Sequence, residues 1–216
     1  MSPSERELPL FPLERAVLFP GASLPLKIFE ERYRVMIGLC QVTDQLFGVL
    51  LIRSGHEVGA PAVPERVGCT ARMIRVERVP DGRMNILTVG EQRFRLLSAP
   101  RLTAEGYLVG DVRLLEDETS TEVPAALVSQ VTAEFEKYQA AVLSRTRRLA
   151  PLPPPAVPSD PLRLSYHVAA GLHVHPRECQ QLLEVSDVAE RLEQELRLLR
   201  RENRPAPKTI GPFSPN

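Results

Sequence analysis

The residues best suited to metal chemistry are histidines near the C-terminal end of the chain. His173 and His175 are two residues apart and His167 lies nearby, so their imidazoles could share a metal ion. No acidic or cysteine ligand stands at a supporting spacing, and Pro176 marks this segment as a helix junction. We therefore predict no metal site here, and no motif in the chain indicates a cofactor.

The three cysteines are the next candidates for chemistry. Cys40, Cys69 and Cys179 are odd in number and far apart, and each lies in a mostly apolar or strand-like run. A thiol nucleophile needs a polar, electropositive setting beside a histidine. Ser165 lacks a nucleophile elbow of the Gly-x-Ser-x-Gly kind. The pattern predicts structural thiols in a reducing, cytoplasmic compartment and no enzyme active site.

The charge balance narrows the choice of partners. The 216 residues carry 27 Lys+Arg and 27 Asp+Glu, a formal net charge of +0, whereas nucleic-acid binders usually show a basic excess. No run approaches the roughly 18 apolar residues of a membrane helix. RNA binding stays an alternative, because several arginines fall on neighbouring predicted strands, although acidic residues alternate with them. They are Arg72, Arg75, Arg78, Arg83, Arg93 and Arg95.

The first 118 residues are predicted to form short strands. The clearest hairpin turns at residues 80–82, because Ile74 and Val76 alternate with charged residues before it and a similar alternation follows it. Gly90 is interpreted as a further turn between strands. A sheet of many short strands usually closes on itself to hide its edges, so we expect a β pseudo-barrel.

One helix is predicted among these strands, and more follow them. Helical spacing of Tyr33, Met36 and Ile37 indicates a helix over Glu30 to Leu39. From Pro124 to about Leu149 a single apolar stripe predicts one long helix. Its members are Leu127, Val131, Phe135, Tyr138 and Val142.

Three shorter helices are expected near the C-terminal end. Asp160-Pro161, Pro176 and Ser186-Asp187 are typical helix starts, because Asp caps exposed amides and Pro suits the first helical position. A proline-rich connector over 150–160 precedes them. Residues 204–216 contain four prolines and are predicted to be a disordered tail.

Several motifs in a fixed order point to a family. They are Leu8-Pro9-Leu10-Phe11-Pro12-Leu13, Val17-Leu18-Phe19-Pro20-Gly21, Leu24 to Tyr33, Gly68 to Arg72, Pro80-Asp81-Gly82-Arg83 and Gly90 to Arg95. This series resembles the N-terminal substrate-binding domain of the Lon ATP-dependent proteases over residues 8–203. The resemblance implies an α+β fold, in which a PUA-like mixed β pseudo-barrel over 1–118 precedes a helical lobe over 119–203.

The resemblance implies a module that engages unfolded or apolar polypeptide segments. A complete Lon protease also carries a phosphate-binding loop and a Ser-Lys dyad, but no Gly-x-x-x-x-Gly-Lys run occurs in these residues. We therefore expect a stand-alone, non-enzymatic relative. One version of this role is an adaptor for a separate protease or chaperone. In that version the long helix at 124–149 and the charged helix at 187–203 offer surfaces for a partner or for self-association. The other alternative is a small-molecule site or enzyme between the two lobes.

Candidate polypeptide-binding residues are apolar side chains on loops and the barrel rim, where a chain can add to a strand edge or insert into a groove. They are Phe29, Tyr33, Met84, Phe94 and Tyr107, for each of which core packing is the competing interpretation. Phe29 and Tyr33 are also expected to seat the helix on the barrel. Other residues match the family motifs and are expected to be structural. They are Pro12, Pro20, Gly21, Glu30, Arg32, Gly82 and Arg93.

Overall fold

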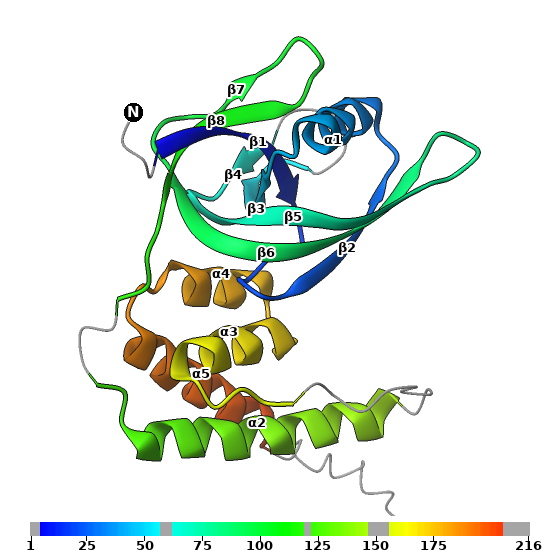
Figure 1. The fold of residues 1–216 in the computed structure, drawn as a ribbon. Coiled ribbons are helices and arrows are strands. Elements are labelled where there is room, and N and C mark those ends of the chain that lie inside the picture. Colours follow the sequence, from blue (N-terminus) through cyan, green and yellow to red (C-terminus); the bar gives the residue numbers. More distant parts are fainter. Residues whose placement is uncertain (1–4, 57–61, 119–121, 147–155, 205–216) are drawn as a thin grey trace, which may run out of the picture.

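The structure is a computed structural model that describes residues 5–56, 62–118, 122–146 and 156–204. A barrel lobe stacks on a helical lobe (Figure 1). The barrel lobe contains β1 (Glu5–Leu13), β2 (Ser23–Ile28), α1 (Glu31–Thr43), β3 (Phe47–Ser54), β4 (Val63–Pro64), β5 (Val67–Arg78), β6 (Met84–Leu96), β7 (Arg101–Leu102) and β8 (Leu108–Leu114). The helical lobe contains α2 (Ala125–Thr146), α3 (Pro161–Gly171), α4 (Pro176–Glu184) and α5 (Val188–Glu202).

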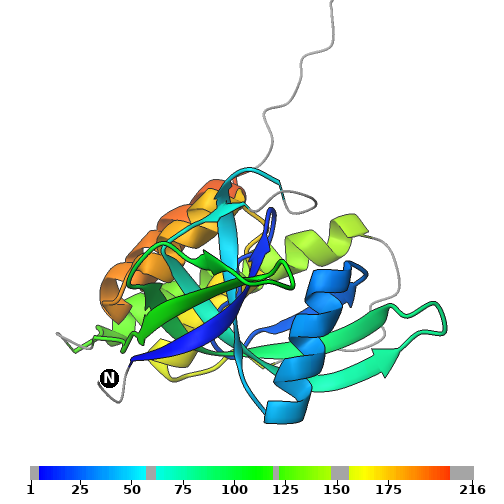
Figure 2. The same ribbon diagram turned by 90° about the horizontal axis from the view of Figure 1, so that it is seen from above.

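The sheet closes into a ring. Its strand order is β2-β6-β5-β3-β1-β8-β7, and β6 also pairs with β8, so β6, β5, β3, β1 and β8 surround a common interior. β1 and β3 are parallel, whereas the other pairs are antiparallel. The expected α+β class with a mixed, closed sheet is confirmed. The hairpin of β5 and β6 extends beyond the ring as an arm beside α1 (Figure 2).

The arm follows the predicted alternation on one strand but not on the other. In β6 the side chains of Met84 and Ile86 are buried, as expected. In β5 the pairing shifts register between Met73 and Arg75, so Ile74 is an extra residue in its strand and its side chain is 58% exposed. The prediction that Ile74 shares the buried face was therefore wrong.

Gly90 was wrongly interpreted as a turn, because β6 runs straight through it. A Cβ atom at Gly90 would lie 2.2 Å from the backbone oxygen of Phe19, so only glycine allows this approach. The Pro20-Gly21 turn docks there: the Gly21 amide donates to the Gly90 oxygen at 2.8 Å, and the Gly90 amide donates to the Ala22 oxygen at 2.9 Å. The glycine therefore fixes a loop onto the barrel.

The helices begin where the sequence places them. The side chain of Asp160 accepts from the Arg163 amide and that of Asp187 from the Glu190 amide, which confirms both predicted caps. The apolar residues of α2, α3 and α5 share one core with Phe19 and Val67 of the barrel lobe. Residues 147–155 and 205–216, which include most of the predicted connector and tail, lie outside the described residues. No described helix is both long and apolar enough to cross a bilayer.

Candidate functional site

Helix α1 is apolar on two opposite faces. Its inner face is buried against the barrel through Tyr33, Met36, Ile37 and Cys40. Its opposite face carries Val35, Leu39 and Val42, which are 40%, 46% and 88% exposed and which we name the outer stripe. The side of a surface helix that faces away from the core usually carries polar or charged residues. The outer stripe is therefore an apolar surface without a covering element among the described residues.

Local contacts hold α1 on the barrel and neutralise its charges. The centre of the Tyr33 ring lies 4.3 Å from the centre of the Phe11 ring. Arg34 donates to the oxygen of Gly82 in the hairpin turn at 3.0 Å and pairs with Glu31. Gly82 has a positive φ of 84°, which favours glycine at this position.

The remaining charges at the start of α1 also pair with each other. Arg32 and Glu30 form an ion pair at 2.9 Å, and the Arg32 guanidinium lies 4.5 Å from the centre of the Tyr33 ring. These contacts give Glu30 and Arg32 a structural role at the helix start. The arginines bordering the outer stripe are thus already neutralised, which suits an apolar partner better than a polyanion.

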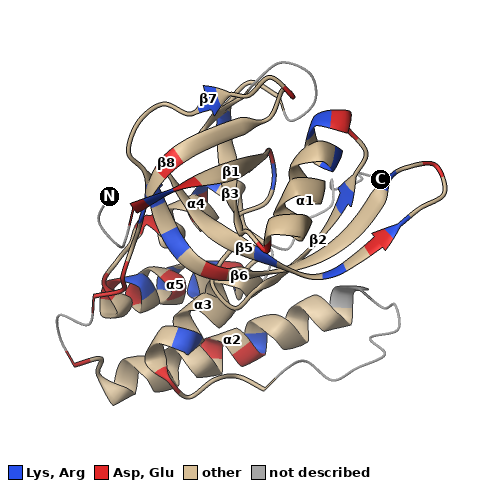
Figure 3. Cartoon of the chain, turned by 45° about the horizontal axis from the view of Figure 1, so that its top comes forward, with Lys and Arg blue, Asp and Glu red and all other residues tan. Residues whose placement is uncertain are grey.

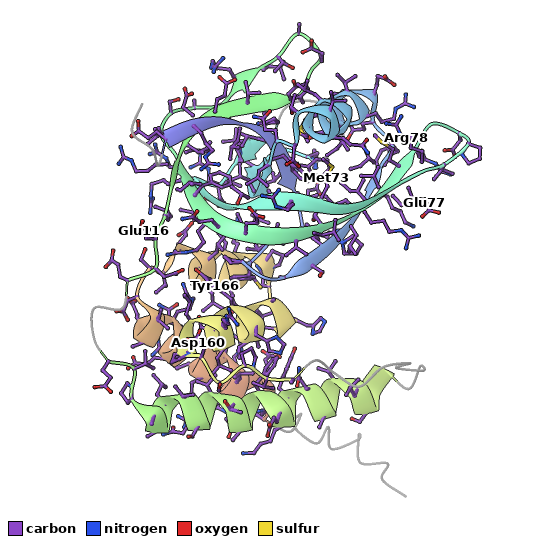
Figure 4. All side chains as sticks on the ribbon, in the orientation of Figure 1. Met73, Glu77, Arg78, Glu116, Asp160 and Tyr166 are labelled. Atoms are coloured by element: carbon purple, nitrogen blue, oxygen red, sulfur yellow. The ribbon has the colours of Figure 1, made fainter. Side chains whose placement is uncertain are left out.

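A groove of about 370 Å³ runs between α1 and the arm. Val35 and Gly38 line it on the helix side, and Val79, Pro80 and Met84 line it on the arm. Figure 4 labels Arg78, a lining residue on the arm, between α1 and the hairpin turn. The outer stripe therefore borders, at its N-terminal end, a shallow groove of mixed character, because Glu31, Arg34 and Arg78 also line it.

A larger groove, of about 720 Å³, lies where the two lobes meet. Its barrel wall comes from the Pro20-Gly21 turn, β6 and the segment after β8, and its other wall is one face of α3. Figure 4 places Glu116 and Tyr166 on these opposite walls. The sequence predicted a junction of this kind as the place for an alternative small-molecule or enzyme site.

A buried arginine joins the lobes beneath this groove. Arg93 is 1% exposed and donates to the backbone oxygens of Leu183 and Val185, both at 3.0 Å. These oxygens belong to the carbonyl end of α4, which attracts a cation. Arg93 also donates to the Glu116 oxygen at 3.1 Å and pairs with Asp117 at 3.0 Å. These contacts join β6 to the end of α4 and to the segment after β8.

Asp117 is the centre of a buried polar cluster. It pairs with Arg191 at 3.1 Å. Its two carboxylate oxygens accept hydrogen bonds from the Tyr166 hydroxyl, at 2.5 and 2.7 Å. Burial raises the pKa of Tyr166, so the phenol stays protonated and acts as a donor. The sequence did not predict that Arg93, Asp117, Tyr166 and Arg191, which we name the clasp, would meet.

Glu195 of α5 is buried without a partner. Its exposed fraction is 0%, and neither carboxylate oxygen accepts a hydrogen bond from the described residues. Burial raises the pKa of Glu195 well above its usual value, although the nearby Arg191 opposes this. The spacing of Val188, Arg191 and Glu195 by three and four residues was a signal that both charged side chains face the core, because these positions share one side of a helix.

The inter-lobe groove offers little to a catalytic mechanism. The described residues that line it include no Ser, Thr, Cys or Lys nucleophile, and Asp117 is held by the clasp. His167 packs edge-on against Phe135, and burial lowers its pKa. Among the described lining residues, no hydroxyl or thiol stands beside a histidine in the arrangement typical of acyl transfer.

The remaining histidines near this lobe have structural contacts. Nδ1 of His173 lies 3.3 Å from the Tyr138 hydroxyl. His175 caps α4 by accepting from the Arg177 amide, and Glu178 bonds back to the His175 amide. These contacts account for two of the three imidazoles considered as metal ligands.

The buried thiols of Cys40 and Cys69 are expected to be unreactive in the folded protein. Burial raises the pKa of Cys40 to about 11 and also raises the pKa values of Cys69 and Cys179. We therefore expect 5,5′-dithiobis(2-nitrobenzoate) at pH 8 to modify only Cys179, which is half-buried, at a measurable rate. All three thiols should react quickly in urea. Rapid release of two or three equivalents of dye by the native protein would contradict this expectation.

Three of the six arginines considered for RNA binding are buried or already paired. Arg93 is buried, Arg72 pairs with Glu91, and Arg83 pairs with Asp81 at 2.5 Å. Figure 3 shows positive and negative residues interspersed over the lobes. Over the part of the chain that the structure describes, this interspersed distribution differs from the continuous basic stripe that phosphate binding favours.

The structure separates the five candidate polypeptide-binding residues. Phe29 is 54% exposed, so it is available to a partner but does not seat the helix, which corrects that expectation. The other four are core residues because their strands and helix face the barrel interior. They are Tyr33 at 5%, Met84 at 6%, Phe94 at 0% and Tyr107 at 6%. Their burial favours the core-packing interpretation, and a binding role stays a prediction for Phe29 alone.

The outer stripe was missed because only the inner face of α1 was considered. The signal was present, since Val35, Leu39 and Val42 follow helical spacing of four and three.

Pro12 is buried in β1 opposite Leu50.

Comparison with known proteins supplies a family context. The family described as the ATP-dependent protease La (LON) substrate-binding domain matches residues 7–201. The chain is 29% identical over 201 residues to a Lon protease of Roseiflexus castenholzii, covering 90% of this chain and 24% of that protein. It is 30% identical over 203 residues to Lon protease 1 of Thermus thermophilus, covering 91% of this chain and 25% of that protein. The chain thus spans about a quarter of the length of the curated relatives it matches.

Solved structures agree with the fold. A Lon N-terminal domain protein from Xanthomonas campestris has a TM-score of 0.68 and 28% identity, with 89% of this chain and 98% of that chain covered. The N-terminal domain of the Mycobacterium avium complex Lon protease has a TM-score of 0.63 and 19% identity, with 90% of this chain and 98% of that chain covered. This likeness supports the fold alone.

Proposed function

Because this chain belongs to the ATP-dependent protease La (LON) substrate-binding domain family, we propose that it recognises polypeptide through the outer stripe of α1. It binds exposed apolar segments of unfolded chains reversibly and has no catalytic activity of its own. The observation that carries this proposal is the exposure of Val35, Leu39 and Val42 on a helix whose bordering arginines are paired.

The size of the stripe supports weak, reversible binding. Burying a Val or Leu side chain fully contributes roughly 1.5–3 kcal/mol, and these three side chains are only partly exposed. Association also restricts the motion of both partners, which offsets part of this gain. We therefore expect dissociation constants in the micromolar range or weaker for single segments, roughly −8 kcal/mol or less favourable. Such affinities allow a client to be released.

The position of this activity in a larger process is a further part of the proposal. A binder of unfolded segments in the cytoplasm could deliver them to a separate protease or chaperone, as an adaptor does. Affinity capture on the immobilised protein, followed by identification of the retained proteins, tests this version. Retention of unfolded clients without any protease or chaperone would leave the binding function and remove the adaptor role.

Replacing Leu39 and Val42 together with Ser is expected to weaken binding of an unfolded probe at least tenfold. The physical reason is the loss of apolar surface that the bound segment would cover. Reduced, carboxymethylated α-lactalbumin is a suitable probe, and fluorescence anisotropy of the labelled probe measures the dissociation constant. The native form of the same protein should not bind.

The matched control is Leu102→Ser on β7, an exposed leucine (54%) away from α1. This variant should bind the probe like the unsubstituted protein. Because all three substituted side chains are exposed, the free energy of unfolding should change by no more than about 0.5 kcal/mol in either variant. Equal binding by both variants would remove the outer stripe from the proposed function.

A further inference from the structure

We propose that the segment bound on the outer stripe of α1 is an amphipathic helix rather than an extended chain. The inference rests on the proposed function and specifies the class of segment that this surface takes. It follows from the spacing of the exposed side chains, from a glycine between them and from the size of the surface.

The spacing of the stripe matches a helical partner. Val35 and Val42 are seven residues apart, with Leu39 between them, which is the repeat of a helix–helix seam. Along the helix axis the two valines are separated by about 10.5 Å, close to two turns of a partner helix. In an extended chain the side chains on one face recur every two residues, and two such repeats span about 13 Å, so they would not match the spacing of the stripe. A helix with apolar residues three and four positions apart would match this spacing.

Gly38 supplies the second argument. It lies in the middle of α1, where glycine is a poorer helix former than alanine. No heavy atom lies within 4 Å of the position that a Cβ atom would occupy, so no contact among the described residues requires glycine there. Gly38 adjoins Leu39 and also lines the groove toward the arm. A notch at this place lets the backbone of an outside helix approach α1 closely.

The size of the surface excludes a larger occupant. A stable interface between folded proteins buries about 800 Å² per partner. The three partly exposed side chains of the outer stripe offer on the order of 200–300 Å² of apolar area, a small fraction of that need. Figure 2 shows α1 on the outside of the barrel, with no described element drawn over it. The surface therefore fits one short helix, about as long as α1, better than a second copy of this chain.

Two labelled peptides test the inference. The first has 14 residues, leucines at positions 1, 4, 8 and 11, and a side-chain lactam that holds it helical. The second differs only in having no lactam and two prolines in its centre, which prevent a helix. Fluorescence anisotropy should show the helical peptide binding at least tenfold more tightly. Equal affinities of the two peptides overturn the inference.

Substitution of Gly38 provides a matched test in the protein. Gly38→Leu fills the notch and should weaken binding of the helical peptide at least tenfold, while the added apolar side chain leaves binding of the proline peptide unchanged or tighter. Gly38→Ala should have a smaller effect in the same direction. Both variants should unfold at the same or a higher urea concentration, because the site is open and glycine is a poor helix former. Unchanged binding of the helical peptide by Gly38→Leu overturns the inference.

The outcomes separate this inference from the proposed function. If carboxymethylated α-lactalbumin binds and neither peptide does, the helical inference is overturned and the proposed function stands. If the probe and both peptides fail to bind, the proposed function is overturned, and the inference that rests on it falls as well.

Discussion

Replacing Arg93 with Met is expected to lower the free energy of unfolding by about 3–5 kcal/mol, because the substitution removes a buried cation from its ion pair with Asp117. The backbone oxygens of Leu183, Val185 and Glu116 would lose a buried donor. Each buried acceptor left without a donor contributes about 1–3 kcal/mol to such a loss, although the terms are not additive. Asp117 would retain Arg191 and Tyr166, so the cluster would not lose all of its contacts.

Urea unfolding followed by circular dichroism measures this change, provided that the transition remains two-state. The matched control is Arg95→Met, two residues further along β6, where the side chain is exposed and has no ion-pair partner among the described residues. This control should stay within about 0.5 kcal/mol of the unsubstituted protein. A loss below 1 kcal/mol for Arg93→Met would show that the clasp does not hold the lobes together.

Glu195→Gln is expected to stabilise the protein by about 1–3 kcal/mol at pH 8, because the buried carboxyl has no donor to stabilise its ionised form. Burial raises its folded-state pKa above the unfolded value of 4.5. Well below pH 4.5 the group is protonated in both states. As the pH rises, the unfolded chain loses the proton first, so stability falls by up to about 1.4 kcal/mol per pH unit until the folded-state pKa is reached.

The measurement is the free energy of unfolding of both proteins at several pH values from 4 to 8. The difference between the variant and the unsubstituted protein should be smallest near pH 4 and should grow with pH. Glu193→Gln, an exposed position on the same helix, should show no such growth. The stability difference for Glu195→Leu should grow with pH as it does for Glu195→Gln. Because leucine has no amide, this result would exclude the buried amide as the cause. Parallel pH profiles would mean that Glu195 is ionised in the folded protein.

Local signals predicted the local elements well. Asp160 and Asp187 mark helix starts because a short carboxylate can accept from free amides of the first turn, which depends only on neighbouring residues. The hairpin at residues 80–82 was likewise predicted from a turn flanked by alternating side chains. The family resemblance was also present in the sequence, and it led to the fold class and to a polypeptide-binding role.

Long-range contacts were not predictable in the same way. Gly90 has the composition of a turn, but the Phe19 backbone, 71 positions earlier in the chain, decides that it serves a close approach within a strand. The exposure of Ile74 depends on the register of β5 against β6. In both cases the deciding atoms belong to another segment, and local composition does not record their position.

By itself, the sequence determined the hairpin at residues 80–82, the positions of the helices, the helix caps and the family. Only the tertiary structure decided which apolar and charged faces are covered. Periodicity shows that Val35, Leu39 and Val42 share a face, but their exposure depends on whether another element packs over them. In the same way, Arg191 and Glu195 are buried because the surrounding helices enclose α5. Periodicity is a property of one segment, whereas burial is a property of the packing of several segments.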